Sequence, residues 1–167
     1  GILPTPRQVV DPTPVPYRAQ DDPAWAQEVL GDTGYTMAQE GSLFCSLSMA
    51  LETCGVDADP GALNRAFVDN DMYVNGNAAD LTRLSELYPQ IVFSAPRDFD
   101  GEDITQALVD GRACMVRVQK GESAHWLCVV GSTSEDFLVL DPAAGDGQAR
   151  SLADFGNVFA LALFDAN

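Results

Sequence analysis

The spacing of apolar residues changes near residue 111, and this change limits the folds open to the chain. Before it, apolar residues recur at helical intervals, which predicts four helices over residues 42–53, 59–67, 77–88 and 103–110. After it, short apolar runs alternate with glycine-containing turns, which is typical of strands. These runs are residues 113–119, 125–130, 137–140 and 158–164. The order predicts an α+β fold in which N-terminal helices pack on a C-terminal antiparallel sheet.

Length and charge restrict the partners of the chain. With 167 residues, 46% of them hydrophobic, it has the size and composition of one domain with a substantial core. Its 25 acidic and 9 basic residues give a net charge of −16. This charge argues against nucleic acid and against an anionic membrane surface, because both attract basic proteins. No apolar run reaches the roughly 18 residues that span a bilayer.

The start of the chain differs from the rest in its proline content. Residues 1–21 contain five of the ten prolines, which favours an extended polyproline II conformation and excludes a helix. We expect 1–21 to be a Pro-rich tail or linker and 22–167 to be the domain. Two interpretations fit the tail: a linker to something upstream, which we favour, or an arm lying on the domain. The linker interpretation makes the chain part of a longer multidomain protein.

The cysteines form no recognisable metal or redox motif. They are Cys45, Cys54, Cys114 and Cys128, and no two of them are spaced as C-x-x-C. Three lie in apolar stretches, where a reduced thiol packs as a small apolar side chain; one disulfide is the alternative. The acidic loop 69–77 lacks the ligand spacing of a calcium-binding loop. A zinc site with two histidines is excluded because the chain has one histidine.

That histidine, His125, begins a predicted strand directly after a polar turn. The next strand ends in Asp141-Pro142, and neighbouring antiparallel strands would bring Asp141 back beside His125. An aspartate in that place holds an imidazole in one tautomer and stabilises its charge. The alternative is a surface histidine and a turn-forming Asp-Pro pair, and the pattern alone does not choose between them.

Segment 36–51 (TMAQEGSLFCSLSMAL) supplies a possible nucleophile. Met49 follows Ser42 by seven residues and Gly55 follows it by thirteen; the His125 strand and the Asp141-Pro142 pair come later. In this order and spacing the residues resemble the papain-like cysteine peptidases, in particular the bacteriocin-processing peptidases and their broader bacterial relatives. The resemblance covers about residues 22–164.

The resemblance implies a papain-like fold and hydrolysis of peptide or amide bonds through an acyl-enzyme. It places the nucleophile at position 42, makes His125 the general base and has Asp141 orient the histidine. Those families carry cysteine where this chain carries Ser42, and a serine hydroxyl is too weak an acid to form the thiolate–imidazolium pair. Two explanations fit: an introduced Cys→Ser change that inactivates a peptidase, which we favour, or a natural pseudoenzyme that binds peptides or cell-wall fragments.

Cys45 is the rival nucleophile. Gln39 precedes it by six residues, and a glutamine at that distance supplies an oxyanion-hole donor in papain-like enzymes. Helix geometry directs Cys45 about 60° away from Ser42, and the spacing to Met49 favours position 42. With the nucleophile at position 42, the residue six earlier is Thr36. Backbone N–H groups with Thr36 or Gln39 would then form the oxyanion hole.

The resemblance therefore implies a thiol peptidase, its inactivated form or a natural pseudoenzyme. We expect a peptide or protein as substrate, and the charge of −16 favours cationic peptides or amines. No metal or cofactor is implied. We further expect a monomer and a bacterial protein that is secreted or displayed on the cell surface.

Overall fold

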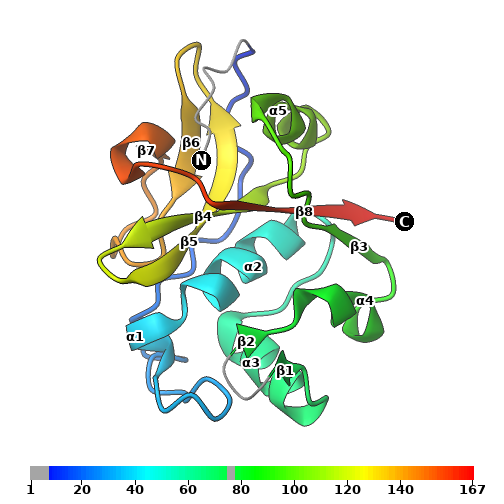
Figure 1. The fold of residues 1–167 in the computed structure, drawn as a ribbon, viewed down its shortest axis with the longest axis vertical. Helices are drawn as coiled ribbons and strands as arrows, with labels where there is room; N and C mark the ends of the chain where they lie inside the picture. The colour runs from blue at the N-terminus through cyan, green and yellow to red at the C-terminus, as the bar shows by residue number, and fades with distance from the viewer. Residues whose placement is uncertain (1–7, 75–77) are drawn as a thin grey trace.

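A six-stranded antiparallel sheet forms the centre of the computed structural model, which describes residues 8–74 and 78–167 (Figure 1). Its strand order is β3-β8-β4-β5-β6-β7. The strands are β3 (Ile91–Ser94), β4 (Cys114–Lys120), β5 (Ser123–Ser132), β6 (Phe137–Leu140), β7 (Arg150–Ser151) and β8 (Ala160–Ala166). A separate two-stranded ladder joins β1 (Tyr73–Val74) to β2 (Ala78–Ala79).

Helices cover both faces of this sheet. They are α1 (Met37–Glu40), α2 (Ser42–Glu52), α3 (Pro60–Asp69), α4 (Leu84–Leu87) and α5 (Gly101–Val109), with 3-10 turns η1 (Leu81–Arg83) and η2 (Leu152–Phe155). Figure 1 shows α2 against one face of the sheet, with α3 and α4 beyond it, and α5 on the opposite side. Both α2 and α5 contact β4 and β5, so these two strands are covered on both faces.

Alternation along β4 and β5 divides the core into two layers. Met115 and Cys128 point toward α2, whereas Cys114 and Leu127 point toward α5. The middle of α2 contributes Leu47 to the first layer with no exposed surface. Burial of each such large apolar side chain stabilises the fold by about 1.5–3 kcal/mol. The first layer of the core therefore joins α2 to the sheet.

The predicted α+β architecture is confirmed, with one error among the helices. Helices predicted over 42–53, 59–67 and 103–110 correspond to α2, α3 and α5. The helix predicted over 77–88 is wrong within its described part: the chain forms β2, then η1, then the four-residue α4. Asp80 explains the break, because its backbone is extended and its side chain accepts the N–H of Thr82 to begin a new turn. Residue 77 lies outside the described residues.

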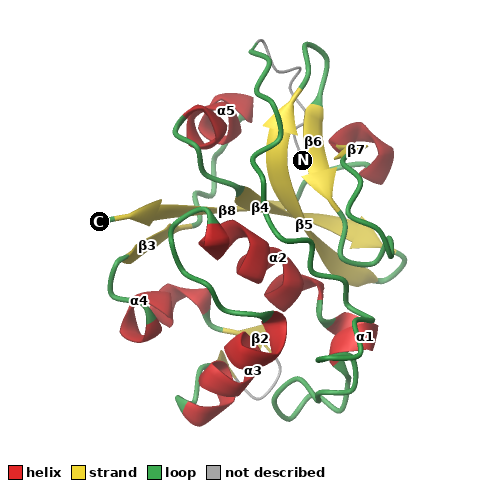
Figure 2. Cartoon of the chain, turned by 180° about the vertical axis from the view of Figure 1, so that it is seen from behind, coloured by secondary structure: helices red, strands yellow, loops and turns green. Residues whose placement is uncertain are grey.

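Residues 8–20, here named the N-terminal strap, lie as an arm on the sheet (Figure 2). Val10 and Ser132 exchange two backbone hydrogen bonds of 3.0 and 2.9 Å, and the Thr13 N–H donates to the Val130 carbonyl at 2.9 Å. A Cβ atom on Gly131 would lie 2.8 Å from the Val10 carbonyl oxygen, so this crossing requires glycine. The strap thus continues the sheet alongside the end of β5.

Among the described residues, no helix combines the length and apolar content that a membrane crossing requires.

Candidate active site

A tight turn between α1 and α2 places Ser42 at the first position of an eleven-residue helix. The Gly41 N–H donates to the Met37 carbonyl at 2.8 Å, and a Cβ on Gly41 would collide with the side chain and carbonyl of Met37. Only glycine therefore permits this close turn. The free N–H groups of the first helical turn carry partial positive charge, which favours an anion beside Ser42.

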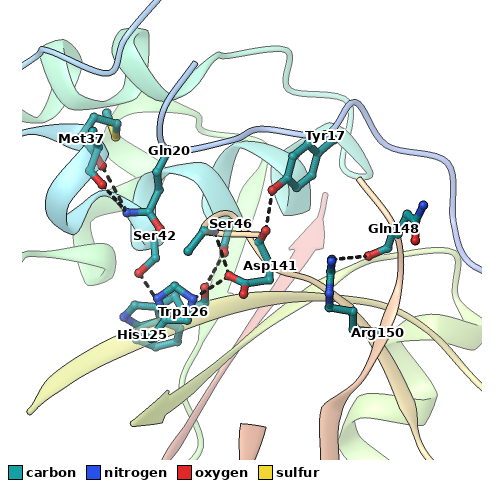
Figure 3. A network of polar contacts seen from close by, with 12 residues as sticks. Tyr17, Gln20, Met37, Ser42, Ser46, His125, Trp126, Asp141, Gln148 and Arg150 are labelled. Carbon is teal, nitrogen blue, oxygen red and sulfur yellow. Dashed lines mark hydrogen bonds and ion pairs between the residues drawn. The ribbon is translucent and has the colours of Figure 1, made fainter. Parts of the chain in front are cut away.

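Two serines of α2 hold the backbone of Trp126 on β5. The Trp126 N–H donates to Ser42 Oγ at 3.0 Å, and Ser46 Oγ donates to the Trp126 carbonyl at 3.1 Å (Figure 3). β5 extends beyond its pairing with β6 at this residue, so the sheet leaves the Trp126 N–H and carbonyl without a hydrogen bond to β6. The two serines provide these hydrogen bonds instead. The contacts fix the start of α2 directly against the strand residue that follows His125.

His125 and Asp141 form a buried pair. Pairing of Cys128 with Leu140 brings the residues after β6 back beside His125. His125 Nε2 lies 2.7 Å from Asp141 Oδ1, and the two residues are 6% and 8% exposed. The Ala143 N–H donates to the same carboxylate oxygen at 2.9 Å. With Nε2 engaged, Nδ1 is the ring nitrogen that remains for a reacting group.

The surroundings of Asp141 favour its ionised form. Burial raises the pKa of this carboxyl group, and the hydrogen bonds from His125 and from the Ala143 N–H lower it. Together the lowering effects outweigh burial, so the pKa of Asp141 lies below its ordinary value. The charged carboxylate is thereby available to accept the imidazole N–H. It would also stabilise an imidazolium if one formed.

This pKa shift predicts a pH-dependent contribution of Asp141 to stability. A carboxyl group whose pKa is lower in the folded chain stabilises the fold fully above its unfolded pKa of about 3.9. The contribution is lost as the pH falls through the lower, folded value. Urea unfolding of the chain and of Asp141→Asn should show the largest difference in unfolding free energy above about pH 5 and a shrinking difference below about pH 4. A difference that does not change with pH contradicts this assignment.

The N-terminal strap also holds the loop that carries Asp141. The Tyr17 hydroxyl donates to the Asp141 carbonyl at 2.6 Å, and the Gln20 N–H donates to the Pro142 carbonyl at 2.9 Å. Burial raises the pKa of Tyr17 to about 12, so the phenol stays protonated and keeps its donor. The strap therefore positions the carboxylate that contacts His125.

Gln20, which the sequence analysis did not single out, lies in the site. It is 6% exposed, and its Nε2 donates to the Met37 and Ala38 carbonyls at 3.3 and 3.4 Å, just before the turn into Ser42. Figure 3 shows its side chain extending from the strap toward the start of α2. Its amide oxygen is buried without a hydrogen-bond partner in the described part of the chain. The available signal was a polar amide three residues after the apolar-aromatic run Val15-Pro-Tyr17.

The two residues proposed from the sequence for the oxyanion hole lie elsewhere. Thr36 is the N-cap residue of α1, and Gln39 is exposed on the same helix. Gln39 Oε1 accepts the Thr36 N–H at 2.9 Å, which closes a capping box. Both side chains therefore stabilise the beginning of α1, and the structure does not bring them to Ser42.

A cleft of about 620 Å³ opens beside Ser42. It runs between the start of α2, the beginning of β5 and the β1–β2 ladder. Its aromatic walls include Tyr35, Tyr73 and Trp126, and its charged residues are Glu40 and Arg117. This volume suits a segment of peptide or a small molecule. Position 42 is thus reachable by a ligand.

Solved structures of peptidases share this arrangement of elements. A protein assigned as a C39-like peptidase from Bacillus anthracis superposes with a TM-score of 0.63 and 12% identity, over 96% of this chain and 98% of its own. The peptidase domain of Streptococcus ComA, a bifunctional ABC transporter of a quorum-sensing pathway, gives a TM-score of 0.53 and 12% identity, over 75% of this chain and 91% of its own. The chain has the papain-like peptidase fold. No family model matches the sequence, and no curated protein matches it.

In this papain-like fold, the four cysteines are placed where their thiols are poorly ionised. Cys45, Cys114 and Cys128 are buried, Cys54 is half-buried, and all four are free thiols. Burial raises the pKa of every one of them, to about 12 for Cys114. Cys45 is turned into the core from α2 and has no exposed surface. In the described residues, no group of three or more acidic, histidine or cysteine side chains is arranged to hold a metal ion.

Proposed function

We propose that this chain carries the active site of a papain-type peptide hydrolase, with position 42 as nucleophile, His125 as general base and Asp141 orienting the imidazole. Serine at position 42 leaves that site inactive or very slow. The observation that carries the proposal is the buried 2.7 Å contact between His125 and Asp141, next to a helix start that holds Ser42 on the adjacent strand residue. The papain-like fold supports it, since the solved structures that share this fold are described as peptidases.

In the proposed reaction, a thiolate at position 42 attacks the carbonyl carbon of a peptide bond. The carbonyl π electrons move onto oxygen, and the N–H groups at the start of α2 stabilise that oxyanion. His125 then gives its proton to the departing amine as the C–N bond breaks. In the second half, His125 takes a proton from water, which attacks the acyl-enzyme and releases the acid and the thiolate.

Gln20 is the proposed side-chain donor of the oxyanion hole, in place of Thr36 and Gln39. Its buried amide oxygen has no partner in the described residues, and its amide nitrogen contacts carbonyls of the segment leading into Ser42. Rotation of the amide about its last side-chain bond exchanges oxygen for NH₂. That rotation gives up the hydrogen bonds from Nε2 to the Met37 and Ala38 carbonyls, and a ligand oxyanion beside position 42 compensates for them by accepting a charge-assisted hydrogen bond from the NH₂.

Serine weakens the proposed site at its first step. A thiol at a helix start beside a histidine is readily deprotonated, whereas a hydroxyl must lose its proton during the attack itself. Ser42 Oγ also accepts the Trp126 N–H, which uses electron density that the attack would need. His125 and Asp141 therefore retain their geometry while the group they would activate is the wrong one.

Covalent labelling tests the proposed nucleophile. The Ser42→Cys chain is treated with a peptidyl chloromethyl ketone, a thiol-directed reagent that needs both a peptide cleft and an activated sulfur. Peptide mapping by mass spectrometry should find the adduct on residue 42, in that chain and in a Ser42→Cys/Cys45→Ala chain alike. The parent chain should stay unlabelled. An adduct on Cys45 of the parent chain would identify Cys45 as the nucleophile instead. An unlabelled Ser42→Cys chain contradicts the proposed function.

Peptide binding without cleavage is the second candidate function. The observation that favours it is the use of Ser42 Oγ as acceptor for the Trp126 N–H, because oxygen accepts a hydrogen bond better than sulfur. Together with Ser46, Ser42 then holds the wall of the cleft as a structural residue. An inert Ser42→Cys chain whose parent still binds peptides would favour this function over the first.

A further inference from the structure

Among the described residues, Arg117 is a cation without a partner in a strongly acidic protein. Five arginines form ion pairs with acidic neighbours: Arg18, Arg65, Arg83, Arg112 and Arg150. The chain contains 25 acidic residues, yet within residues 8–74 and 78–167 the Arg117 side chain forms no ion pair and no hydrogen bond. It lies in the cleft beside Ser42, half-buried. A guanidinium held in a cleft in this way is available to a ligand.

Sheet register places this guanidinium on the cleft wall next to position 42. Arg117 of β4 stands opposite Trp126 of β5. Its carbonyl accepts the Phe159 N–H on the far side of β4, while the Trp126 backbone bonds to α2, so the two residues form a non-hydrogen-bonded pair. Side chains of such a pair share one face of the sheet, with Cβ atoms about 4.5–5.5 Å apart. Arg117 therefore extends over the face that carries Trp126 and the start of α2.

We propose that Arg117 selects peptides that carry an acidic side chain next to the amide bond bound at Ser42. The proposal rests on the proposed function, which makes an extended peptide the ligand. A guanidinium binds a carboxylate with two parallel hydrogen bonds, and the aromatic walls accept an apolar neighbour of the acidic residue. A side-chain carboxylate fits better than a chain terminus, because a backbone whose amide lies over position 42 continues past Arg117.

This local preference differs from the one that net charge predicts. The charge of −16 attracts cationic ligands out to about the screening length of 8–10 Å. Arg117 acts at contact distance, where its half-buried position limits screening. Glu40 lies in the same cleft, and its carboxylate repels any additional acidic side chains of the peptide. The favoured peptide therefore has one acidic residue at a defined position and no general acidic character.

Selection from a peptide library tests this proposal on the full chain with Ser42 in place. N-acetylated, C-amidated hexapeptides, randomised at each position in turn, are passed over the immobilised protein and the retained peptides are sequenced. We expect Asp and Glu to be enriched at one position. A fluorescent peptide made from the result should bind about ten- to a hundredfold more tightly than its Gln-for-Glu counterpart. In Arg117→Gln this difference should disappear, and Arg117→Glu should favour Lys or Arg at that position.

Arg97→Gln is the matched control, since Arg97 is an exposed arginine away from the cleft and its replacement changes the net charge equally. Thermal unfolding by circular dichroism verifies that each variant folds. An acidic preference that persists in Arg117→Gln, or is lost equally in Arg97→Gln, overturns the proposal. The proposal is also overturned if, in a parallel library, the protein retains only peptides with a free C-terminus.

Two outcomes separate this proposal from the proposed function. If the parent chain retains no peptide and the Ser42→Cys chain is inert, the proposed function is contradicted as well. If the Ser42→Cys chain cleaves peptides without an acidic preference, only the role of Arg117 is contradicted.

Discussion

Replacing Ser42 by cysteine should raise the rate of peptide hydrolysis by at least about 10³-fold over the parent chain. The substitution supplies the one group that the site lacks. In the proposed site, the N–H groups at the start of α2 and the imidazole of His125 both favour the thiolate form of a cysteine at this position. The partner of that imidazole is already in place, 2.7 Å away and nearly inaccessible to solvent. Hydrolysis of a quenched fluorescent peptide library, followed as initial rates, measures the effect.

Ser46→Cys is the matched control for this gain. Ser46 lies one turn after Ser42 on the same face of α2 and contacts the same backbone residue, Trp126, but it is completely buried. A cysteine there should leave the rate at the level of the parent chain. His125→Ala in the Ser42→Cys chain should return the rate to within about tenfold of that level, because the thiol loses both its base and its counter-ion. An equal gain from both cysteine variants would mean that the activity does not arise at position 42.

Removing the Gln20 amide should cost the Ser42→Cys chain about 10²–10³ in kcat, with little change in KM. The physical reason is that an oxyanion-hole donor contacts the carbonyl oxygen most strongly when that oxygen carries charge, so its loss raises the barrier more than it weakens substrate binding. Gln20→Ala is the variant, and steady-state kinetics on a single fluorogenic peptide separate kcat from KM. Urea unfolding of the same variant verifies that the strap remains folded on the sheet.

Gln39→Ala provides the comparison for Gln20. Gln39 is the glutamine that the sequence pattern favours, and in the structure it is exposed and accepts the Thr36 N–H. Its replacement should lower the stability of α1 slightly and leave kcat within about twofold. If Gln39→Ala reduces kcat as much as Gln20→Ala does, or if Gln20→Ala acts only through KM, Gln20 is not the oxyanion donor.

The proximity of His125 and Asp141 could be predicted because it depends on local geometry. Two consecutive antiparallel strands with a short connection return the chain to its starting edge, so the end of the second strand meets the start of the first. The helix starts could be predicted for the same reason: Asp59 caps α3 through the Ala62 N–H, a contact over three residues. The start of α2 at Ser42 likewise followed from the spacing of apolar residues within one helix, whereas the role of position 42 as nucleophile rests on the resemblance and stays a prediction.

Contacts between distant segments could not be predicted in this way. Gln20 reaches the site because the strap pairs with the end of β5, where Val10 meets Ser132 across 122 residues. A proline-rich sequence indicates an extended conformation but does not indicate the surface on which it lies. That Arg117 has no partner in the described part of the chain depends on the whole fold, since composition alone supplies many acidic residues that could have neutralised it.

The most direct test of the central claim measures how alkylation of residue 42 by iodoacetamide depends on pH in the Ser42→Cys chain. Quantitative mass spectrometry separates this residue from the native cysteines, whose pKa values burial raises. If position 42 is a nucleophile site served by His125 and Asp141, the midpoint should lie at least about one pH unit below the ordinary thiol value of about 8.5. It should return toward that value in Ser42→Cys/His125→Ala. A midpoint at or above about 8.5 in both chains would contradict the claim.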